Sequence, residues 1–285
     1  MPVTAVSPAK AAVIGHPIAH SKSPALHRAA YRWLGVDIDY QAIDVSAGEL
    51  PGLVQRLREQ AGWRGLSVTM PHKAAIADLV DEVDPVAAKL GVLNTVRVRE
   101  DGALIGSNTD VAGIINALQQ AGLRSVETFS RPPIVLGGGG TALAALAALA
   151  ELGGGEAQLY LRNPDKLGAL AVVADRLGLS LEVLPLAALS ALRAELVLST
   201  LPPGAADELL GSVTSSAGYL LDVAYDPWPS ALASAWQAAG GTVVSGLEML
   251  LYQAVEQVAL FSGVVISDRN GLVNVMCDSI GLPRR

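Results

Sequence analysis

A lysine at the end of the segment from Ser67 to Lys73 is the first residue whose type and position suggest chemistry. This segment, S-V-T-M-P-H-K, leaves an apolar run and enters a predicted helix. A cation in the first helical turn opposes the helix macrodipole, so a structural role alone explains Lys73 poorly. Half-buried beside a carboxylate, Lys73 could donate a proton to a developing alkoxide and hold a substrate hydroxyl.

Three further polar segments have two explanations each. Thr109 or Asp110 could simply cap the predicted helix at 111–118. Asn94 precedes a strand, where a turn residue is equally natural. Ser23 suits an N-cap with Pro24 at the first helical position, which leaves Ser21 unexplained, and two hydroxyls at a helix start are also suited to binding a carboxylate.

A glycine-rich turn indicates a dinucleotide site. Gly137, Gly138, Gly139 and Gly140 are followed by Thr141-Ala142, which matches G-x-G-x-x-A between an apolar strand and a helix. Glycines let the backbone approach a pyrophosphate, whose charge is met by free N–H groups and the positive end of the helix dipole. A flexible glycine turn is the alternative.

The end of the next predicted strand favours NADP over NAD. An NAD site usually has an acidic residue there to hold the ribose hydroxyls. This chain instead has Leu161-Arg162-Asn163-Pro164, with no acidic residue until Asp165. The planar guanidinium of Arg162 suits a 2′-phosphate, although Arg162 could also be an exposed residue at a strand end.

Short apolar runs alternate with helical patterns along the chain, which predicts an α/β fold with a mostly parallel sheet. The segment 125–133 interrupts this pattern and indicates a connection between domains. The pattern then restarts in the order of a nucleotide-binding domain, with strands near 134–136, 158–161, 196–199, 219–223 and 242–244. Amphipathic spacing after Gly246 predicts a helix, and a last helix is expected at about 267–280.

Length and composition agree with two α/β domains. The chain has 285 residues, and this length exceeds the usual size of one domain. Hydrophobic residues make up 51% of the chain and charged residues 16%. The net charge of -7 and the absence of a basic run argue against nucleic acid or an anionic membrane as the main partner. A small-molecule ligand is the simpler expectation.

Cysteine and histidine usage predicts neither a disulfide framework nor a metal site. Cys277 is the single cysteine, and the four histidines have no metal-ligand spacing. The N-terminus lacks the features of a secretory signal, and the apolar run 141–152 is too short for a membrane span. We therefore expect a cytoplasmic protein.

The ordered motifs of the chain resemble the shikimate dehydrogenase family. They are H-S-x-S-P-x-x-H at 20–27, V-T-M-P-H-K at 68–73, N-T at 94–95, N-T-D-x-x-G at 108–113, the glycine turn, D-x-x-Y-x-P at 222–227, and G-L-E-M-L at 246–250 followed by Gln253 and Ala254. The match spans nearly the whole chain.

The resemblance implies a shikimate dehydrogenase, an oxidoreductase of aromatic amino-acid and chorismate biosynthesis that reduces 3-dehydroshikimate with NADPH in a cleft between two domains. It implies a substrate-binding domain of residues 1–109 plus about 247–285, to which the C-terminal helices return, and a Rossmann-type domain of residues 110–246. Lys73 and Asp110 would form the catalytic pair. Gly246 would lie near the nicotinamide, and the substrate would contact Ser21, Ser23, Thr69, Lys73, Asn94, Asp110, Tyr225 and Gln253.

The chain departs from the family pattern at three places. Ser67 stands where the family commonly has Asn, Leu161-Arg162-Asn163 replaces N-R-T, and the segment 199–203 only partly matches N-x-T-x-x-G. Two other functions remain open, an NAD-dependent quinate or quinate/shikimate dehydrogenase and a catalytically silent dinucleotide-binding regulator. A monomer and a homodimer are both compatible with the apolar helix faces.

Overall fold

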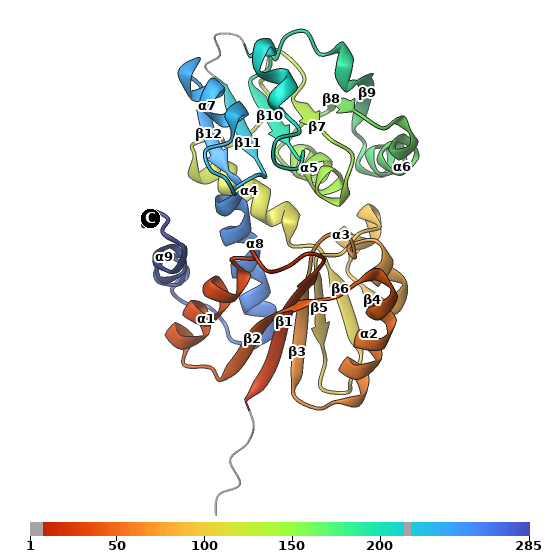
Figure 1. Ribbon diagram of the computed structural model, residues 1–285, viewed down its shortest axis with the longest axis vertical. Coiled ribbons are helices and arrows are strands. Elements are labelled where there is room, and N and C mark those ends of the chain that lie inside the picture. Colours follow the sequence, from red (N-terminus) through yellow and green to blue (C-terminus); the bar gives the residue numbers. More distant parts are fainter. Residues whose placement is uncertain (1–7, 214–217) are drawn as a thin grey trace, which may run out of the picture. The chain divides into compact units, whose positions relative to one another are not determined.

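The structure, a computed structural model, describes residues 8–213 and 218–285 (Figure 1). Residues up to Thr109 together with Gln253–Arg285 form one compact unit, and Asp110–Tyr252 form the other. Helix α8 (Gly246–Ser262) begins in the second unit and ends in the first. The C-terminal part of the chain therefore returns to the first unit, as the sequence resemblance implies.

A six-stranded sheet forms the centre of the first unit among the described residues. The strands are ordered β2-β1-β3-β5-β6-β4, and β5 is antiparallel to both of its neighbours while the other pairs are parallel. The prediction of a mostly parallel sheet is confirmed. The bounds are β1 Ala9–Gly15, β2 Ile38–Asp44, β3 Trp63–Val68, β4 Glu82–Val83, β5 Thr95–Val98 and β6 Leu104–Ser107.

Side chains of this sheet alternate between two packed faces, as strand geometry requires. Leu66 and Val68 of β3 join an apolar cluster with the buried face of α2 (Leu50–Glu59). Ser67, between them, points to the other face and contacts α8 through Gln257. Helix α1 (Ser23–Leu34) packs on β2 and against α9 (Arg269–Ile280) (Figure 1).

The second unit holds a parallel six-stranded sheet within the described residues, ordered β12-β11-β10-β7-β8-β9. This is the strand order of a doubly wound dinucleotide-binding domain, in which the order reverses between the first and fourth strands, here β7 and β10. The bounds are β7 Ile134–Leu136, β8 Glu156–Leu161, β9 Ser180–Pro185, β10 Leu196–Ser199, β11 Tyr219–Asp222 and β12 Thr242–Ser245.

Helices cover both faces of the second sheet. Helix α5 (Gly140–Glu151) is buried along most of its length, and its many alanines let it pack closely against α4 (Asp110–Gln120) and α6 (Leu167–Leu177). On the other face, Trp236 of α7 (Ala231–Ala238) is fully buried in a second apolar cluster. In the described parts of the chain, no helix is both long enough and apolar enough to cross a membrane.

The structure corrects the expected surroundings of Ser23 and Lys73. Ser23 is the first residue of α1 rather than its N-cap, a position that Lys22 takes. Lys73 lies in a turn before a short 3-10 helix (Ala75–Leu79) and not in the first turn of an α-helix. Ile76 of that 3-10 helix is fully buried in the core. A short 3-10 helix therefore stands where an α-helix was expected.

Strands β4 and β9 were not predicted from the sequence, and helix α3 (Pro85–Leu90) had no predicted bounds. β9 ends in Pro185, which argues against a central strand. The structure places β9 at the edge of its sheet, where a proline is tolerated because its missing N–H faces away from the ladder.

Gly65 is required by close packing between β3, β5 and α8. A Cβ atom on Gly65 would overlap both the carbonyl oxygen of Val96 and the ring of Phe261. Because backbone cannot move aside cheaply, we expect Gly65→Ala to lower the free energy of unfolding by about 1–3 kcal/mol. Thermal unfolding followed by circular dichroism measures this change.

Gly52→Ala is the matched control. Gly52 lies in α2, and no atom approaches the position of its Cβ within 4 Å. Alanine there should raise stability by about 0.5–1 kcal/mol because it restricts the unfolded chain. Equal melting temperatures for the two variants would contradict the packing described for β3.

Candidate functional site

The loop after β1 and the start of α1 carry the two serines expected to bind a carboxylate. Ser21 is half-buried, and its hydroxyl oxygen accepts a hydrogen bond from the backbone N–H of Ser23 at 3.3 Å. Ser23 is buried, and its hydroxyl lies beside the phenol of Tyr40, whose pKa is raised by burial. The structure thus brings the two serines together at one end of α1.

The loop after β3 is held against two neighbouring segments. The backbone N–H of Thr69 donates to the carbonyl of Ile14 in β1 at 2.9 Å. The buried ring of His72 donates from Nε2 to the carbonyl of Val45 at 2.6 Å. Lys73 is half-buried, and its carbonyl accepts from the N–H of Leu93 at 2.8 Å. These bonds place the Lys73 backbone next to the segment that carries Asn94.

Asn94 is buried at the centre of a polar network in the first unit. Its Oδ1 accepts from the backbone N–H of Thr109 and from the hydroxyl of Thr95, both at 2.8 Å. Its Nδ2 donates to the hydroxyl oxygen of Thr109 at 2.9 Å and to Oε1 of Gln253 at 3.2 Å. Two of the expected substrate residues, Asn94 and Gln253, therefore lie in contact although 159 residues separate them.

Asp110 directly follows Thr109 and is the first residue of α4. It is buried, with 4% of its surface exposed, and the N–H of the preceding residue is bonded to Asn94. Asp110 belongs to the second unit and Lys73 to the first. The pairing of their side chains stays a prediction.

The glycine turn of the second unit contains two kinds of glycine. At two positions an added side chain would collide with other protein atoms, and at a third position it would not. Gly137 has a φ of +104°, and a Cβ there would lie 2.6 Å from the hydroxyl of Thr200. A Cβ on Gly138 would lie 2.8 Å from Leu161. Gly139 is the N-cap of α5 in an extended conformation, and nothing lies within 4 Å of its Cβ position. The space in front of Gly139 is open for a ligand.

Basic side chains accompany this turn. Arg162 and Asn163 are exposed directly after β8, and Oδ1 of Asn163 accepts from the N–H of Asp165 at 2.9 Å. Lys166 was missed in the sequence, yet its Cβ lies only 3.3 Å from the Cβ position of Gly138. The spacing of Arg162 and Lys166, four residues apart after a strand, was the available signal.

The end of β11 carries the segment with Tyr225. The carboxylate of Asp222 accepts from the hydroxyl of Ser230 at 2.6 Å and from the N–H of Ala224 at 3.2 Å, and its pKa is raised by burial. These bonds hold the segment that leads to Tyr225, which is half-buried and whose pKa is also raised by burial. A role for Asp222 was not predicted from the sequence.

Gly246 is also required by packing, because a Cβ there would overlap the carbonyl group of Val223. Gly246 is the first residue of α8 and follows β12 directly. Its backbone therefore lies at the carboxyl edge of the second sheet, next to the segment that follows β11. This is the edge at which open α/β sheets bind ligands.

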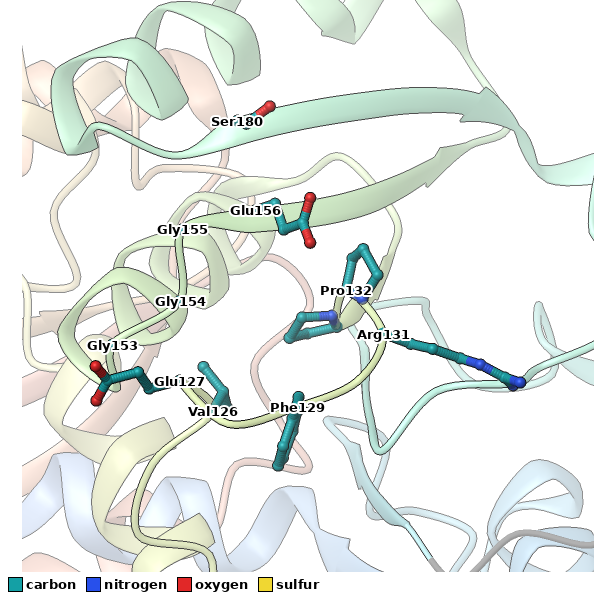
Figure 2. Close-up of a pocket in the computed structure, with 11 residues that line it drawn as sticks. Val126, Glu127, Phe129, Arg131, Pro132, Gly153, Gly154, Gly155, Glu156 and Ser180 are labelled. Carbon is teal, nitrogen blue, oxygen red and sulfur yellow. The ribbon is translucent and has the colours of Figure 1, made fainter.

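A hollow of about 320 Å³ in the second unit lies elsewhere (Figure 2). Glu156 and Ser180, which line it, are the first residues of β8 and β9, so it lies at the amino ends of the strands. Ligands of open α/β sheets bind at the carboxyl ends, where the glycine turn is. Arg131 extends away from the hollow (Figure 2). This hollow is not the candidate dinucleotide site.

Comparisons with known proteins agree on one family. The model described as the shikimate dehydrogenase substrate binding domain matches residues 13–96. A Moorella thermoacetica protein named shikimate dehydrogenase (NADP(+)) is 36% identical over 272 residues, which cover 90% of each chain.

In the described residues, no group of three or more His, Cys, Asp or Glu side chains could hold a metal ion.

Solved structures of shikimate dehydrogenases are also similar to this chain. Shikimate dehydrogenase from Mycobacterium tuberculosis is 39% identical and superposes with a TM-score of 0.84, covering 95% of this chain and 100% of that one. The enzyme from Thermus thermophilus, solved in complex with NADP(H) and shikimate, is 31% identical with a TM-score of 0.80 and the same coverage. The chain therefore belongs to the shikimate dehydrogenase family.

Proposed function

We propose that this protein is an NADP-dependent shikimate dehydrogenase, which catalyses the reversible reduction of 3-dehydroshikimate to shikimate in aromatic amino-acid biosynthesis. The observation that carries the proposal is the similarity to NADP(+)-dependent shikimate dehydrogenases over about nine-tenths of the chain. The polar segments around Asn94 and the glycine turn supply the groups that this reaction needs.

The proposed contacts for a small polyhydroxylated acid come mostly from the first unit, and Asp110 and Tyr225 of the second unit complete them. Ser21 and Ser23 offer hydroxyl donors for the carboxylate, and both lie at the start of α1, where the helix dipole favours negative charge. Six further side chains are the proposed contacts for the hydroxyl and carbonyl groups of the substrate. Of these, only the lysine needs to change protonation state. They are Thr69, Lys73, Asn94, Asp110, Tyr225 and Gln253.

Lys73 and Asp110 are the proposed catalytic pair. When bound, NADPH supplies a hydride to the carbonyl carbon of the substrate. Lys73 stabilises the negative charge that develops on the carbonyl oxygen and gives that oxygen a proton. Asp110 orients the ammonium group and accepts a hydrogen bond from a neighbouring substrate hydroxyl.

The second unit fits a dinucleotide with a 2′-phosphate. The open space before Gly139 lets a pyrophosphate approach the backbone at the start of α5. Gly137, Gly138, Gly140, Thr141 and Gly246 complete the proposed cofactor contacts. Arg162 and Lys166 place two positive charges where NAD-dependent enzymes place a carboxylate for the ribose hydroxyls, and Asn163 adds an amide.

We propose residues 1–109 with about 247–285 as the substrate-binding domain and residues 110–246 as the dinucleotide-binding domain. A quinate or quinate/shikimate dehydrogenase using NAD is the main alternative within the same reaction class. The cytoplasmic location and the choice between monomer and homodimer stay predictions.

Lys73→Met tests the proton-transfer role. The wild-type protein should reduce NADP⁺ when given shikimate, and the variant should lose about 10²–10⁴-fold in kcat with a small change in KM for shikimate, because it lacks the group that accepts the hydroxyl proton when shikimate is oxidised. Absorbance of NADPH at steady state measures both constants. The control is Lys89→Met, an exposed lysine in α3. Unchanged turnover in Lys73→Met with intact folding would refute the role.

Arg162→Ala tests the proposed 2′-phosphate site. The substitution removes a guanidinium that NAD⁺ does not need, so KM for NADP⁺ should rise about tenfold or more while KM for NAD⁺ changes little. Arg124→Ala, which removes an exposed arginine of the same unit, serves as control. Parallel losses with both coenzymes would assign Arg162 to folding instead.

Gly139→Ala tests whether the third glycine serves the ligand rather than the fold. Its Cβ meets no protein atom, so stability should fall only by the cost of a poorer N-cap, about 1 kcal/mol, whereas NADP⁺ binding should weaken about tenfold or more because the pyrophosphate must approach there. Calorimetric titration with NADP⁺ measures the affinity. Gly155→Ala, also in open space, should change neither property. Wild-type affinity in Gly139→Ala would move the pyrophosphate site elsewhere.

A further inference from the structure

The first unit buries an unusual set of polar side chains between its sheet and α8. Those of His27, Ser67, Thr95 and Gln257 are each exposed by 4% or less. Buried polar groups are destabilising unless they are hydrogen-bonded. Replacing hydrogen-bonded partners by apolar groups of the same shape can leave stability nearly unchanged, so these groups call for an explanation beyond stability.

Gln257 lies at the junction of these groups and uses its whole amide. Its Nε2 donates to the carbonyl of Asn94 at 3.1 Å and to the hydroxyl of Thr95 at 2.9 Å. Its Oε1 accepts from the hydroxyl of Ser67 at 2.7 Å and faces Nε2 of His27 at 3.3 Å. An amide has two donors and two acceptor positions, and each of them has a partner here.

The direction of every bond around Gln257 is determined. Burial lowers the pKa of His27 to about 3, so its ring is neutral at physiological pH. Because Nε2 of His27 faces a carbonyl oxygen, Nε2 carries the proton and Nδ1 accepts from the hydroxyl of Tyr31 at 3.0 Å. Tyr40 donates to Ser67, which in turn donates to Gln257. The backbone carbonyl of Asn94 can only accept, so it must face Nε2 of Gln257, and a flipped amide would bring two oxygens together there.

A second chain of bonds leaves Gln257 and ends on Asn94. The hydroxyl of Thr95 accepts from Gln257, so its proton is directed to Oδ1 of Asn94 at 2.8 Å. The same Oδ1 accepts from the N–H of Thr109. The oxygen of the Asn94 amide is thereby held toward the protein, which fixes the direction in which its Nδ2 donates.

We propose that Gln257 is a positioning residue for shikimate binding, which acts through Thr95 to hold the amide of Asn94 in the orientation in which its Nδ2 donates to Thr109 and Gln253. This inference rests on the proposed function. Gln257 also ties three substrate-binding segments together, because Ser67 precedes Thr69 by two residues and His27 follows Ser23 by one helical turn. Gln253, one turn earlier on α8, contacts Asn94 directly.

Gln257→Met tests the proposal because it keeps the volume and removes all four hydrogen bonds. KM for shikimate should rise about tenfold or more, since a misplaced contact group weakens productive binding strongly, and KM for NADP⁺ should stay within about twofold. Val258→Ala is the control for general loosening of α8, because Val258 is fully buried on the same helix. The control should lower the melting temperature without this change in KM.

A double-mutant cycle separates positioning from a merely structural role. If Gln257 acts through Asn94, the variant Asn94→Ala should already have lost the benefit, and adding Gln257→Met should change KM for shikimate by no more than about twofold. Multiplying effects of the two substitutions, or a wild-type KM in Gln257→Met, would overturn the proposal. The wild-type assay with shikimate separately decides the proposed function.

Hydrogen exchange at the backbone amide of Thr109 tests the proposal without any substrate. Loss of the Asn94 orientation should expose the backbone amide of Thr109, so its hydrogen exchange should accelerate in Gln257→Met and not in Val258→Ala. Unchanged protection at Thr109 would overturn the proposal even if shikimate were not the substrate. Should Gln257→Met fail to fold, Thr95→Val breaks the same relay with nearly the same shape and should give the same two changes.

Discussion

Asn94 is buried where four segments of the first unit meet, and its amide is bonded to Thr109, Thr95 and Gln253. A buried amide tolerates few orientations, because each unmet donor or acceptor carries the penalty of lost hydration. The loops that carry the proposed substrate contacts are joined to this point. Val68 donates its N–H to the Asn94 carbonyl, and Leu93 donates to Lys73. The proposed substrate contacts are therefore arranged around a polar centre rather than an apolar one.

In the second unit, the main constraint is that the proposed cofactor pyrophosphate must come close to the backbone of the glycine turn. Gly137 and Gly138 are required by packing within the protein, since side chains there would collide with Thr200 and Leu161. Gly139 leaves room for the proposed cofactor, since nothing lies within 4 Å of its Cβ position. The parallel sheet places this turn at the carboxyl end of β7, beside the point where the strand order reverses. The same geometry places Arg162 at the end of the neighbouring strand β8.

One departure from the family pattern, Ser67, lies within the buried polar network. Ser67 stands where an asparagine is common in related sequences, and its small hydroxyl lies between Tyr40 and Gln257. Ser67 therefore joins the buried network through a glutamine on α8, 190 residues away in the sequence.

The sequence by itself determined the class of fold, the glycine turn, the strand pattern of the second unit and the candidate lysine, because these depend on local periodicity and on residue type. It could not show that Lys73 lies before a 3-10 helix, that β9 is an edge strand, or that Lys166 lies beside Gly138. Those features depend on neighbours distant in sequence. Only the tertiary structure decided the bond directions around Asn94 and Gln257, because a hydrogen bond between segments more than 150 residues apart leaves no periodic signal.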